Sequence, residues 1–465
     1  MYALLGIIAV LGFLLVLCSQ IGRSWLLSPI AVFLIGTSVR WGIGALLVRA
    51  LGSIYLPDFD WGQYKVTFDY MAESTRSWFV FTAGIVSTFI VSVYASRGAW
   101  YREMCIVDEI RRGNARRKLN RILCWLGIYT SVATIAPFII GSSDRGAGYE
   151  YWATQFLRPD AILLVLARLR YVFFFLVGVA FGAKTLETRK MNTLMGFVAM
   201  LAVMGGWQGS RGEFMYPILM LVIGWLVAAG SVKGAVKSLF LVSLLVLVSV
   251  PMIAAFRDTS EFNKTFQHDL LGRINGLISL EQRPELVTRR YFTLGREVYG
   301  CSDGYVYKAE KELSDEVGFG DMGWNRIVNQ IVPAFLGGSK EKFDSAGIVQ
   351  DLIGIERIKS WYPCLYTPAD LYRRGGIFAV MFGGIVYGLV LSILTMLWSN
   401  YVFKDFTGYG QLLVWALPVS IIQAPPAGTV LEVVWVILWE IPKYIVAALI
   451  MGWCMNRFYS PKRLR

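Results

Sequence analysis

The chain has 465 residues, of which 56% are hydrophobic and 17% are charged, and its formal net charge is +13. Because soluble domains carry about 25% charged residues, this composition argues against a water-soluble protein and favours a membrane protein. One histidine and six scattered cysteines without ligand spacing argue against a metal site, and no cofactor is expected. The basic surplus lies mainly in short loops between apolar runs, so nucleic acid is not expected as a partner.

Apolar runs of roughly 17–25 residues follow one another along the chain. Each run is long enough to cross about 30 Å of hydrocarbon, so together they predict an all-α polytopic membrane protein with about eleven transmembrane helices. The first run lacks the basic n-region and cleavage site of a signal peptide, so we expect it to be a span. The predicted spans lie near residues 2–19, 25–49, 77–96, 122–142, 161–183, 192–209, 214–231, 238–256, 376–398, 408–426 and 429–455.

Basic residues gather in connections that share one side of the membrane if the spans alternate. These connections are 97–121, 184–190, 233–237 and the tail 456–465. An excess of Lys and Arg marks cytoplasmic loops, so this side is predicted to be cytoplasmic and the N-terminus to face outward. The predicted organisation is eight helices in 1–256, a large outer loop in 257–375, three helices in 376–455 and a cytoplasmic basic tail in 456–465.

The outer loop 257–375 is polar and dense in aromatic residues, and parts of it have helical character. It is too long to be a plain connection, and loops of this length are usually functional or separately folded. Cys301 and Cys364 both lie in it. An oxidising compartment would allow a disulfide between them, and the sequence leaves two free buried thiols equally open.

Several charges lie inside or at the edge of the apolar runs, all in the predicted outer half of the membrane. Four arginines facing lipid would cost about 10 kcal/mol at ~2.5 kcal/mol each, as much as the net stability of a domain. We therefore expect them to line a polar cavity open to the outer face, where guanidinium groups bind an anion such as phosphate. The embedded charges are Arg40, Arg168, Arg170, Arg211 and Glu213, with Asp370, Arg373 and Arg374 entering the next span and Arg257 and Asp258 leaving the preceding one.

The alternative for arginines near span ends is snorkelling toward lipid headgroups, which suits Arg257, Arg373 and Arg374 taken singly. The anion that best explains a basic cavity in the outer leaflet is a lipid diphosphate. Its sugar would project under the outer loop, where Trp361, Tyr366 and Tyr372 are candidates for sugar contacts. Core packing explains most of the other aromatic residues of this region better than sugar contact does.

Three features resemble the Wzy-type polymerases of bacterial surface polysaccharides. They are the turn "GSRGE" at 209–213, the long outer loop before the last spans, and "YTPADLYRRGGIFAVMFGGIVYGLVL" at 366–391. The last is similar to the family's re-entry segment, in which a Pro-containing turn and a short amphipathic helix lead into a Gly-rich span. Arg211 matches the family's arginine in the turn, and Arg373 and Arg374 lie where the family tends to keep polar residues.

The resemblance implies a GT-C-like membrane glycosyltransferase that needs no metal. Such an enzyme acts at the periplasmic face of the bacterial inner membrane. It transfers a growing glycan from undecaprenyl diphosphate to the non-reducing end of an incoming lipid-linked oligosaccharide, so that both donor and acceptor are lipid-linked. A chain-length-regulating co-polymerase is a further partner that the resemblance suggests, besides the lipid bilayer.

The mechanism expected from these residues is stabilisation of a departing diphosphate by preorganised arginines. Arg211, Arg40 and one of Arg168 and Arg170 are assigned to this role. A carboxylate would take the proton of the acceptor hydroxyl, which is typically worth 10²–10⁴-fold in rate. The candidates for this base are Glu213, Asp258 and Asp370, although Glu213 has the alternative role of pairing with Arg211 and holding it in position.

Two other functions remain open at the level of sequence. An O-antigen-ligase-like enzyme would share the fold class and the donor, and His268 in the outer loop would be its characteristic residue. A non-enzymatic transporter or flippase would also place arginines along a substrate pathway. Transporters usually show repeated halves, and no internal repeat is evident in this sequence.

Overall fold

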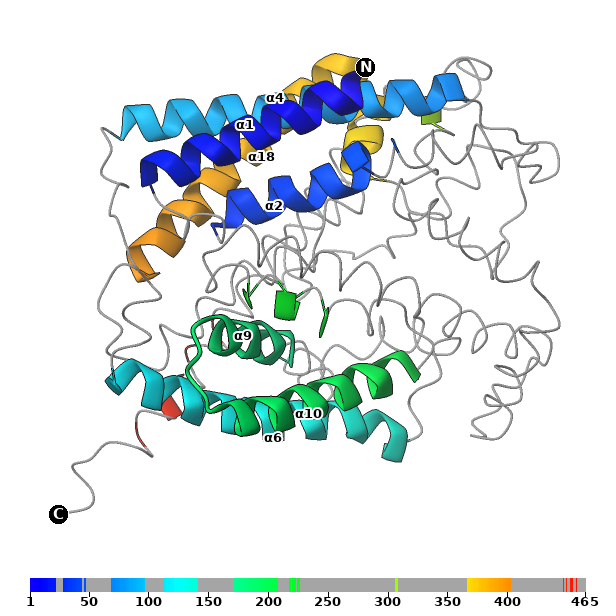
Figure 1. Ribbon diagram of the computed structural model, residues 1–465. Coiled ribbons are helices and arrows are strands. Elements are labelled where there is room, and N and C mark those ends of the chain that lie inside the picture. The colour runs from blue at the N-terminus through cyan, green and yellow to red at the C-terminus, as the bar shows by residue number, and fades with distance from the viewer. Residues whose placement is uncertain are drawn as a thin grey trace, which may run out of the picture. The chain divides into compact units, whose positions relative to one another are not determined.

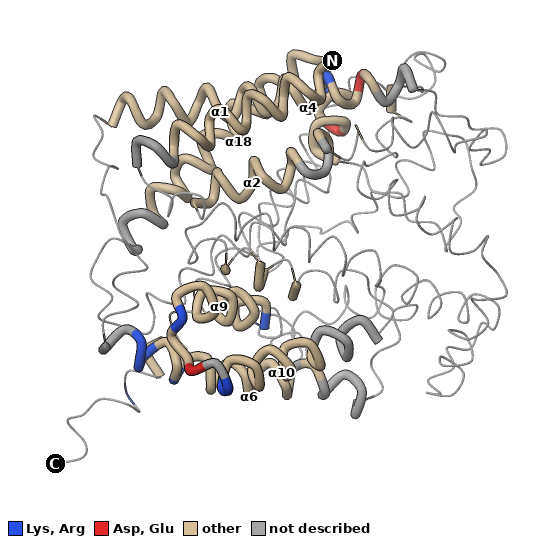
Figure 2. Tube along the Cα trace, viewed as in Figure 1, with Lys and Arg blue, Asp and Glu red and all other residues tan. Residues whose placement is uncertain are grey.

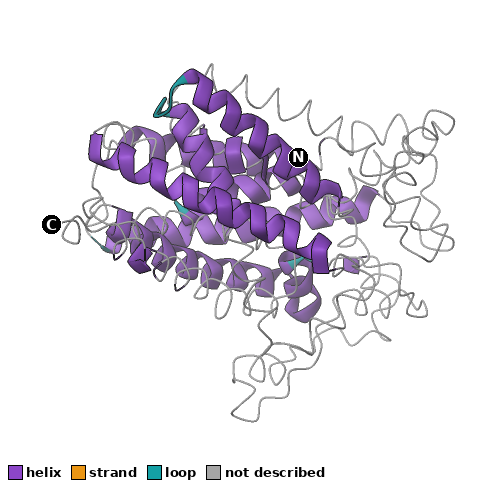
Figure 3. Ribbon diagram, turned by 90° about the horizontal axis from the view of Figure 1, so that it is seen from below, coloured by secondary structure: helices purple, strands orange, loops and turns teal. Residues whose placement is uncertain are grey.

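The computed structural model is almost entirely helical in the residues that it describes, with short turns and no strand among them (Figures 1 and 3). This confirms the all-α prediction. The helices are α1 Tyr2–Ile21, α2 Pro29–Thr37, the π-helix η2 Ser38–Ile43, α4 Phe68–Ala95, α6 Gly113–Ile140, α9 Arg170–Gly182, α10 Thr188–Trp207 and α18 Thr367–Val402. The described residues are 1–21, 28–43, 46, 68–96, 113–140, 170–207, 217, 218, 220–222, 224, 225, 306, 307, 366–402, 446, 449, 452–454 and 457.

Two of the described helices are long and apolar enough to cross a membrane, Ala72–Ala95 and Thr367–Leu397. The core helix of a soluble protein can have the same length and composition, but it is mostly buried. Here only 33% and 28% of the residues in the most apolar 18-residue stretch of each helix are buried, which fits lipid-facing helices better. The predicted spans 238–256 and 408–426 lie outside the described residues, so the count of eleven stays a prediction.

The chain forms two compact units, each assembled from separate stretches of sequence. The first unit comprises Met1–Glu103, Gly295–Phe403 and Ser420–Lys443, and the second comprises Met104–Leu294, Lys404–Val419 and Tyr444–Arg465. Helices α1, α2, η2, α4 and α18 therefore belong to the first unit, and α6, α9 and α10 belong to the second.

Glycines bring the backbones of α4 and α18 into direct contact in the first unit. A Cβ atom on Gly384 would lie 2.5 Å from the Phe81 carbonyl oxygen, and one on Gly388 would lie 2.9 Å from Ile85 Cα. The spacing of Gly384 and Gly388 is the GxxxG pattern by which helices approach closely where lipid supplies no hydrophobic driving force. Gly84 on α4 faces the same contact, because its Cβ would lie 3.1 Å from the backbone of Gly384.

A similar glycine contact holds α9 in the second unit. A Cβ on Gly178 would collide with the backbone at Leu221 and Trp225, and a Cβ on Gly224 would collide with the backbone at Phe175. Helix α9 is buried along nearly its whole length. Because both sides of this contact lack side chains, α9 lies backbone to backbone against the segment that contains Gly224.

Large apolar side chains are exposed on the outer faces of the long helices. On α18 they recur at helical spacing, and Phe378 and Phe382 are 77% and 62% exposed. Helices α1 and α4 carry comparable side chains, such as Leu15 at 70% and Val91 at 65%. Monomeric soluble proteins rarely expose such continuous apolar faces, whereas a lipid environment favours them. These faces agree with the membrane association that the composition predicts.

Candidate functional site

The candidate site lies where the chain enters α18. This helix is broken at Gly375 (φ −168°, ψ 30°) and Gly376 (φ 62°, ψ −158°), so residues 367–374 form a short helix of their own. The backbone of Gly376 occupies a region that residues with a Cβ atom rarely adopt. The structure thus contains the short helix before the Gly-rich span that the re-entry segment predicts, and two glycines join the two parts.

The short helix folds back onto the span that follows it. A Cβ on Gly383 would collide with the Leu371 side chain. These residues would be about 18 Å apart along a straight helix, because each residue rises about 1.5 Å. The break at Gly375 and Gly376 therefore turns the short helix against its own span and fixes the position of its polar side chains.

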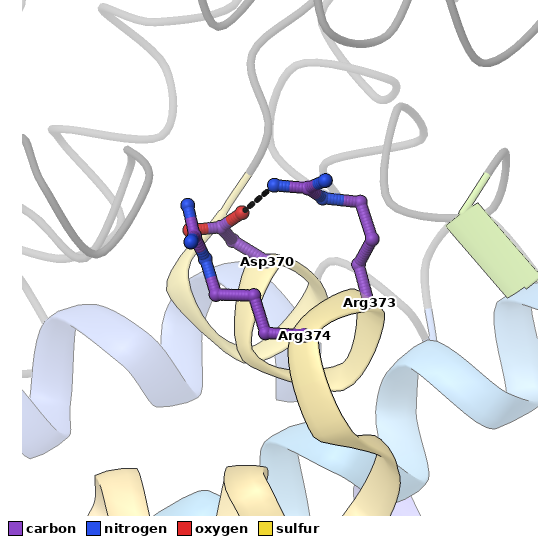
Figure 4. Close-up of polar contacts among 3 residues, drawn as sticks. All are labelled: Asp370, Arg373 and Arg374. Carbon is purple, nitrogen blue, oxygen red and sulfur yellow. Dashed lines mark hydrogen bonds and ion pairs between the residues drawn. The ribbon is translucent and has the colours of Figure 1, made fainter. Parts of the chain in front are cut away.

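Asp370, Arg373 and Arg374 form a buried ionic cluster on this short helix (Figure 4). Arg373 donates to Asp370 Oδ1 and Arg374 Nε donates to Asp370 Oδ2, each at 3.1 Å. The helical spacings i,i+3 and i,i+4 place all three side chains on one face. Two guanidinium groups against one carboxylate leave the cluster with a net charge of +1. We call these three residues the re-entry cluster.

The re-entry cluster is shielded from solvent. The side chains of Asp370, Arg374 and Arg373 are 0%, 6% and 15% exposed. Snorkelling arginines would extend to a polar surface, but these two turn to a carboxylate in the interior. Arg373 Nε is buried, and no acceptor among the described residues reaches it. A buried N–H group of this kind calls for an acceptor, and an anionic ligand would supply one.

The local sequence explains why the short helix forms here. The backbone N–H of Asp370 donates to the Tyr366 carbonyl at 2.9 Å, which closes the first helical turn. Pro368 is tolerated in this turn because the first N–H groups of a helix have no intrahelical acceptor. A carboxylate in the first turn is also favoured by the helix dipole. Asp370 therefore has two effects: it stabilises the start of the short helix, and it pairs with Arg373 and Arg374.

Aromatic rings surround the entry of α18. Tyr366 meets Trp41 edge-on, with ring centroids 5.2 Å apart and an interplanar angle of 85°. Trp41, Trp78 and Tyr366 form one buried cluster. Tyr372 is half-buried, and its ring lies 4.7 Å from that of Tyr307. Of the two described candidates for sugar contact, Tyr372 is thus partly accessible, whereas Tyr366 is buried in packing.

Arg40 lies close in the fold to this region. It belongs to η2, and its neighbour Trp41 packs on Tyr366, one residue before α18 begins. The Arg40 segment and the re-entry cluster therefore both lie next to the aromatic cluster of the first unit. The Arg40 side chain lies outside the described residues. π-Helical turns occur often at functional sites, and neither this turn nor the roles of Trp41 and Trp78 were predicted.

Arg170 belongs to the second unit, at the first residue of α9. Its guanidinium carbon lies 5.0 Å from the centroid of the Tyr171 ring, and it donates to the Tyr171 hydroxyl at 3.2 Å. Stacking on an aromatic ring stabilises a desolvated guanidinium group. Arg170 therefore contacts an aromatic side chain of its own unit.

The other predicted site residues lie outside the described part of the chain. They are Arg168, Arg211, Glu213, Asp258, Trp361 and the pair Cys301 and Cys364, together with His268 and Arg257. Within the described residues, no three His, Cys, Asp or Glu side chains gather in a way that could hold a metal ion. The geometry of the candidate site therefore depends on the re-entry cluster and its aromatic surroundings.

Comparison with known proteins identifies no similar protein. No family model matches the chain, and neither the curated proteins nor the solved structures include a match.

Proposed function

We propose that the protein is a membrane-embedded glycosyltransferase of the Wzy polymerase type. It would join oligosaccharide repeat units carried on undecaprenyl diphosphate at the periplasmic face of the inner membrane, without a metal. The observation that supports this best is the re-entry cluster, a buried group with net positive charge at the start of an apolar helix. In this proposal the diphosphate binds there through Arg373 and Arg374, with Arg40 of the same unit, and the roles expected for Arg168, Arg170 and Arg211 stay predictions from the sequence.

The chemistry of the cluster suits a lipid diphosphate. Guanidinium groups bind phosphate oxygens through parallel charged hydrogen bonds and stay charged at any physiological pH. Arg373 brings a buried Nε–H that lacks an acceptor among the described residues, and phosphate oxygen is a strong acceptor. Phe378 and Phe382 are exposed on the part of α18 that follows the cluster in the sequence, and they would accompany the polyprenyl tail.

The reaction requires that charge on the departing diphosphate be stabilised as the glycosidic bond forms. Arginines held in place before the reaction contribute more to the transition state than to the ground state if they contact the bridging oxygen. Asp370 accepts a hydrogen bond from each arginine through its two oxygens, which would hold them in place for this role.

The same geometry bears on the choice of the general base. Asp370 is fully buried and each of its oxygens accepts a hydrogen bond from a guanidinium group. A base must reach the proton of the acceptor hydroxyl, at about 2.6–3.2 Å between heavy atoms. Asp370 is thus better suited to orient arginines, which leaves Glu213 and Asp258 as the candidates for proton transfer.

The test is polymer formation in cells that depend on this chain. Arg373→Gln removes the charge and keeps much of the side-chain volume, and we expect it to reduce long-chain polymer at least tenfold, because a hydrogen bond to a charged group contributes about 1.5–3 kcal/mol. Arg76→Gln is the matched control, since Arg76 is an exposed arginine paired with Glu73. Immunoblots of the membrane fraction would establish equal protein levels.

A normal long-chain ladder from Arg373→Gln would contradict the proposed role of the cluster, and one from Arg211→Ala would contradict the family assignment. The alternatives separate in the same cells and with purified protein. His268→Ala that abolishes transfer to a lipid A core would favour the ligase. Translocation of a lipid-diphosphate glycan by purified protein without a new glycosidic bond would favour a transporter.

A further inference from the structure

The exposed face of α6 changes along the helix from basic to aromatic to aliphatic residues. Arg117 and Arg121 are exposed at its start, and Trp125, Ile128 and Val132 follow on the same face, 49%, 56% and 62% exposed. Successive members are three or four residues apart, so their side chains stack above one another. The opposite face is buried, with Leu119, Ile122, Leu123 and Leu126 among its residues. We call the exposed row the α6 stripe.

The dimensions of the α6 stripe match one leaflet of a bilayer. From Arg121 to Val132 the helix rises about 16 Å at ~1.5 Å per residue, about half of the ~30 Å hydrocarbon core. Tryptophan is the residue that sits at the headgroup level of membranes. The order cation, tryptophan, aliphatic residues therefore repeats the order headgroup, interface, acyl chain.

The cationic end of the stripe is fixed to its neighbours within the second unit. Arg116 Nε donates to the Thr185 carbonyl at 2.6 Å, in the turn between α9 and α10. That turn is closed by a hydrogen bond from Thr185 N to the Ala180 carbonyl at 3.0 Å, and it exposes Lys184. Figure 2 shows Lys and Arg gathered where α6 begins and where the chain passes from α9 to α10. Cations from two parts of the chain are thus held at one level.

We propose that the α6 stripe binds an anionic phospholipid, with the phosphate at Arg117 and Arg121 and an acyl chain along Trp125, Ile128 and Val132. This goes beyond the positive-inside rule, which needs basic residues on the cytoplasmic side but no apolar row continuous with them. A free phosphate would use only the cationic end, whereas a phospholipid uses the whole stripe. The proposal is independent of the proposed glycosyl transfer.

The test is lipid binding to the purified full chain in detergent, followed by native mass spectrometry. Phosphatidylglycerol and phosphatidylcholine with the same acyl chains are titrated separately, and the first bound lipid is quantified. Each cation near an anionic lipid contributes about 1 kcal/mol, so we expect Arg117→Gln with Arg121→Gln to weaken phosphatidylglycerol binding about 25-fold, which is about fivefold per charge. Trp125→Ala should weaken binding of both lipids.

Two controls make the result specific. Arg76→Gln removes an exposed arginine from α4 in the other unit and should leave phosphatidylglycerol binding unchanged. Arg117→Lys with Arg121→Lys keeps both charges, and its phosphatidylglycerol affinity should stay within a few-fold of the wild-type value. If the glutamine variant does not fold, the lysine variant is measured in its place. In that case a loss of binding in the lysine variant would overturn the proposal.

Three other outcomes would also overturn it. The first is wild-type phosphatidylglycerol affinity in the folded glutamine variant. The second is equal binding of phosphatidylcholine by the wild-type chain. The third is displacement of phosphatidylglycerol by millimolar inorganic phosphate, which would identify the cations as a free phosphate site.

Discussion

The short helix at the entry of α18 and the first turns of α6 are both rich in arginine, yet they use it in opposite ways. Arg374 is buried and turned to a carboxylate, whereas Arg117 and Arg121 are exposed at the start of a helix. Burial requires that a guanidinium group be paired, and Asp370 provides the pairing at the entry of α18. The difference separates a candidate binding site from a surface that we propose to face headgroups.

The largest effect is expected from breaking the re-entry cluster. Asp370→Asn removes the carboxylate charge that two largely buried guanidinium groups share, which should lower the free energy of unfolding by about 3–5 kcal/mol. Glu73→Gln is the matched control, because Glu73 and Arg76 have the same i,i+3 spacing as Asp370 and Arg373 but are 45% and 46% exposed. Exposed pairs of this kind contribute about 0.2–0.5 kcal/mol. Chemical unfolding in detergent measures both, and equal effects would contradict the buried pairing.

A smaller effect is expected at the turn that positions the cluster. Gly376 has φ 62° and open space around an added Cβ, so Gly376→Ala introduces backbone strain without a collision. Strain of this kind is worth about 1–3 kcal/mol. Gly12→Ala, in the interior of α1 with equal space, should instead stabilise by up to about 1 kcal/mol, because alanine favours the helix. The same sign for both variants would show that the turn at Gly376 is not as described.

A further decrease is expected at the basic end of α6. Arg116→Gln removes the hydrogen bond to the Thr185 carbonyl and should destabilise by about 1–2 kcal/mol. Arg117 is the next residue, and its side chain is exposed. Arg117→Gln should therefore change the free energy of unfolding by less than about 0.5 kcal/mol. Thermal unfolding of the two variants side by side measures the difference. A larger decrease in the free energy of unfolding for Arg117→Gln than for Arg116→Gln would mean that the Arg117 side chain stabilises the fold, and it would contradict its role in binding headgroups.

Local patterns in the sequence predict the helices well and the environment of their charges poorly. The predicted span 2–19 corresponds to α1, and the Pro-containing start of α18 is where the re-entry segment predicts a short helix. Asp370 was predicted as a possible base, and its spacing from Arg373 and Arg374 already allowed the pairing that the structure has. Spacing alone does not reveal burial, because burial depends on residues far along the chain such as Trp41 and Gly383.

The π-helical turn at Ser38–Ile43 and the fold-back of Leu371 onto Gly383 had no signal in the sequence pattern. Both depend on packing between distant segments, which periodicity does not encode. Glycine pairs such as Gly384 and Gly388 do carry a readable signal, because their four-residue spacing marks a face for close helix contact.

The most direct test is a structure of the protein with a bound polyprenyl diphosphate. We expect a phosphate oxygen about 2.7–2.9 Å from a guanidinium nitrogen of Arg373, with Asp370 still paired to Arg374. A diphosphate bound elsewhere, with the re-entry cluster unchanged and out of its reach, would contradict the assignment of this cluster as the binding site.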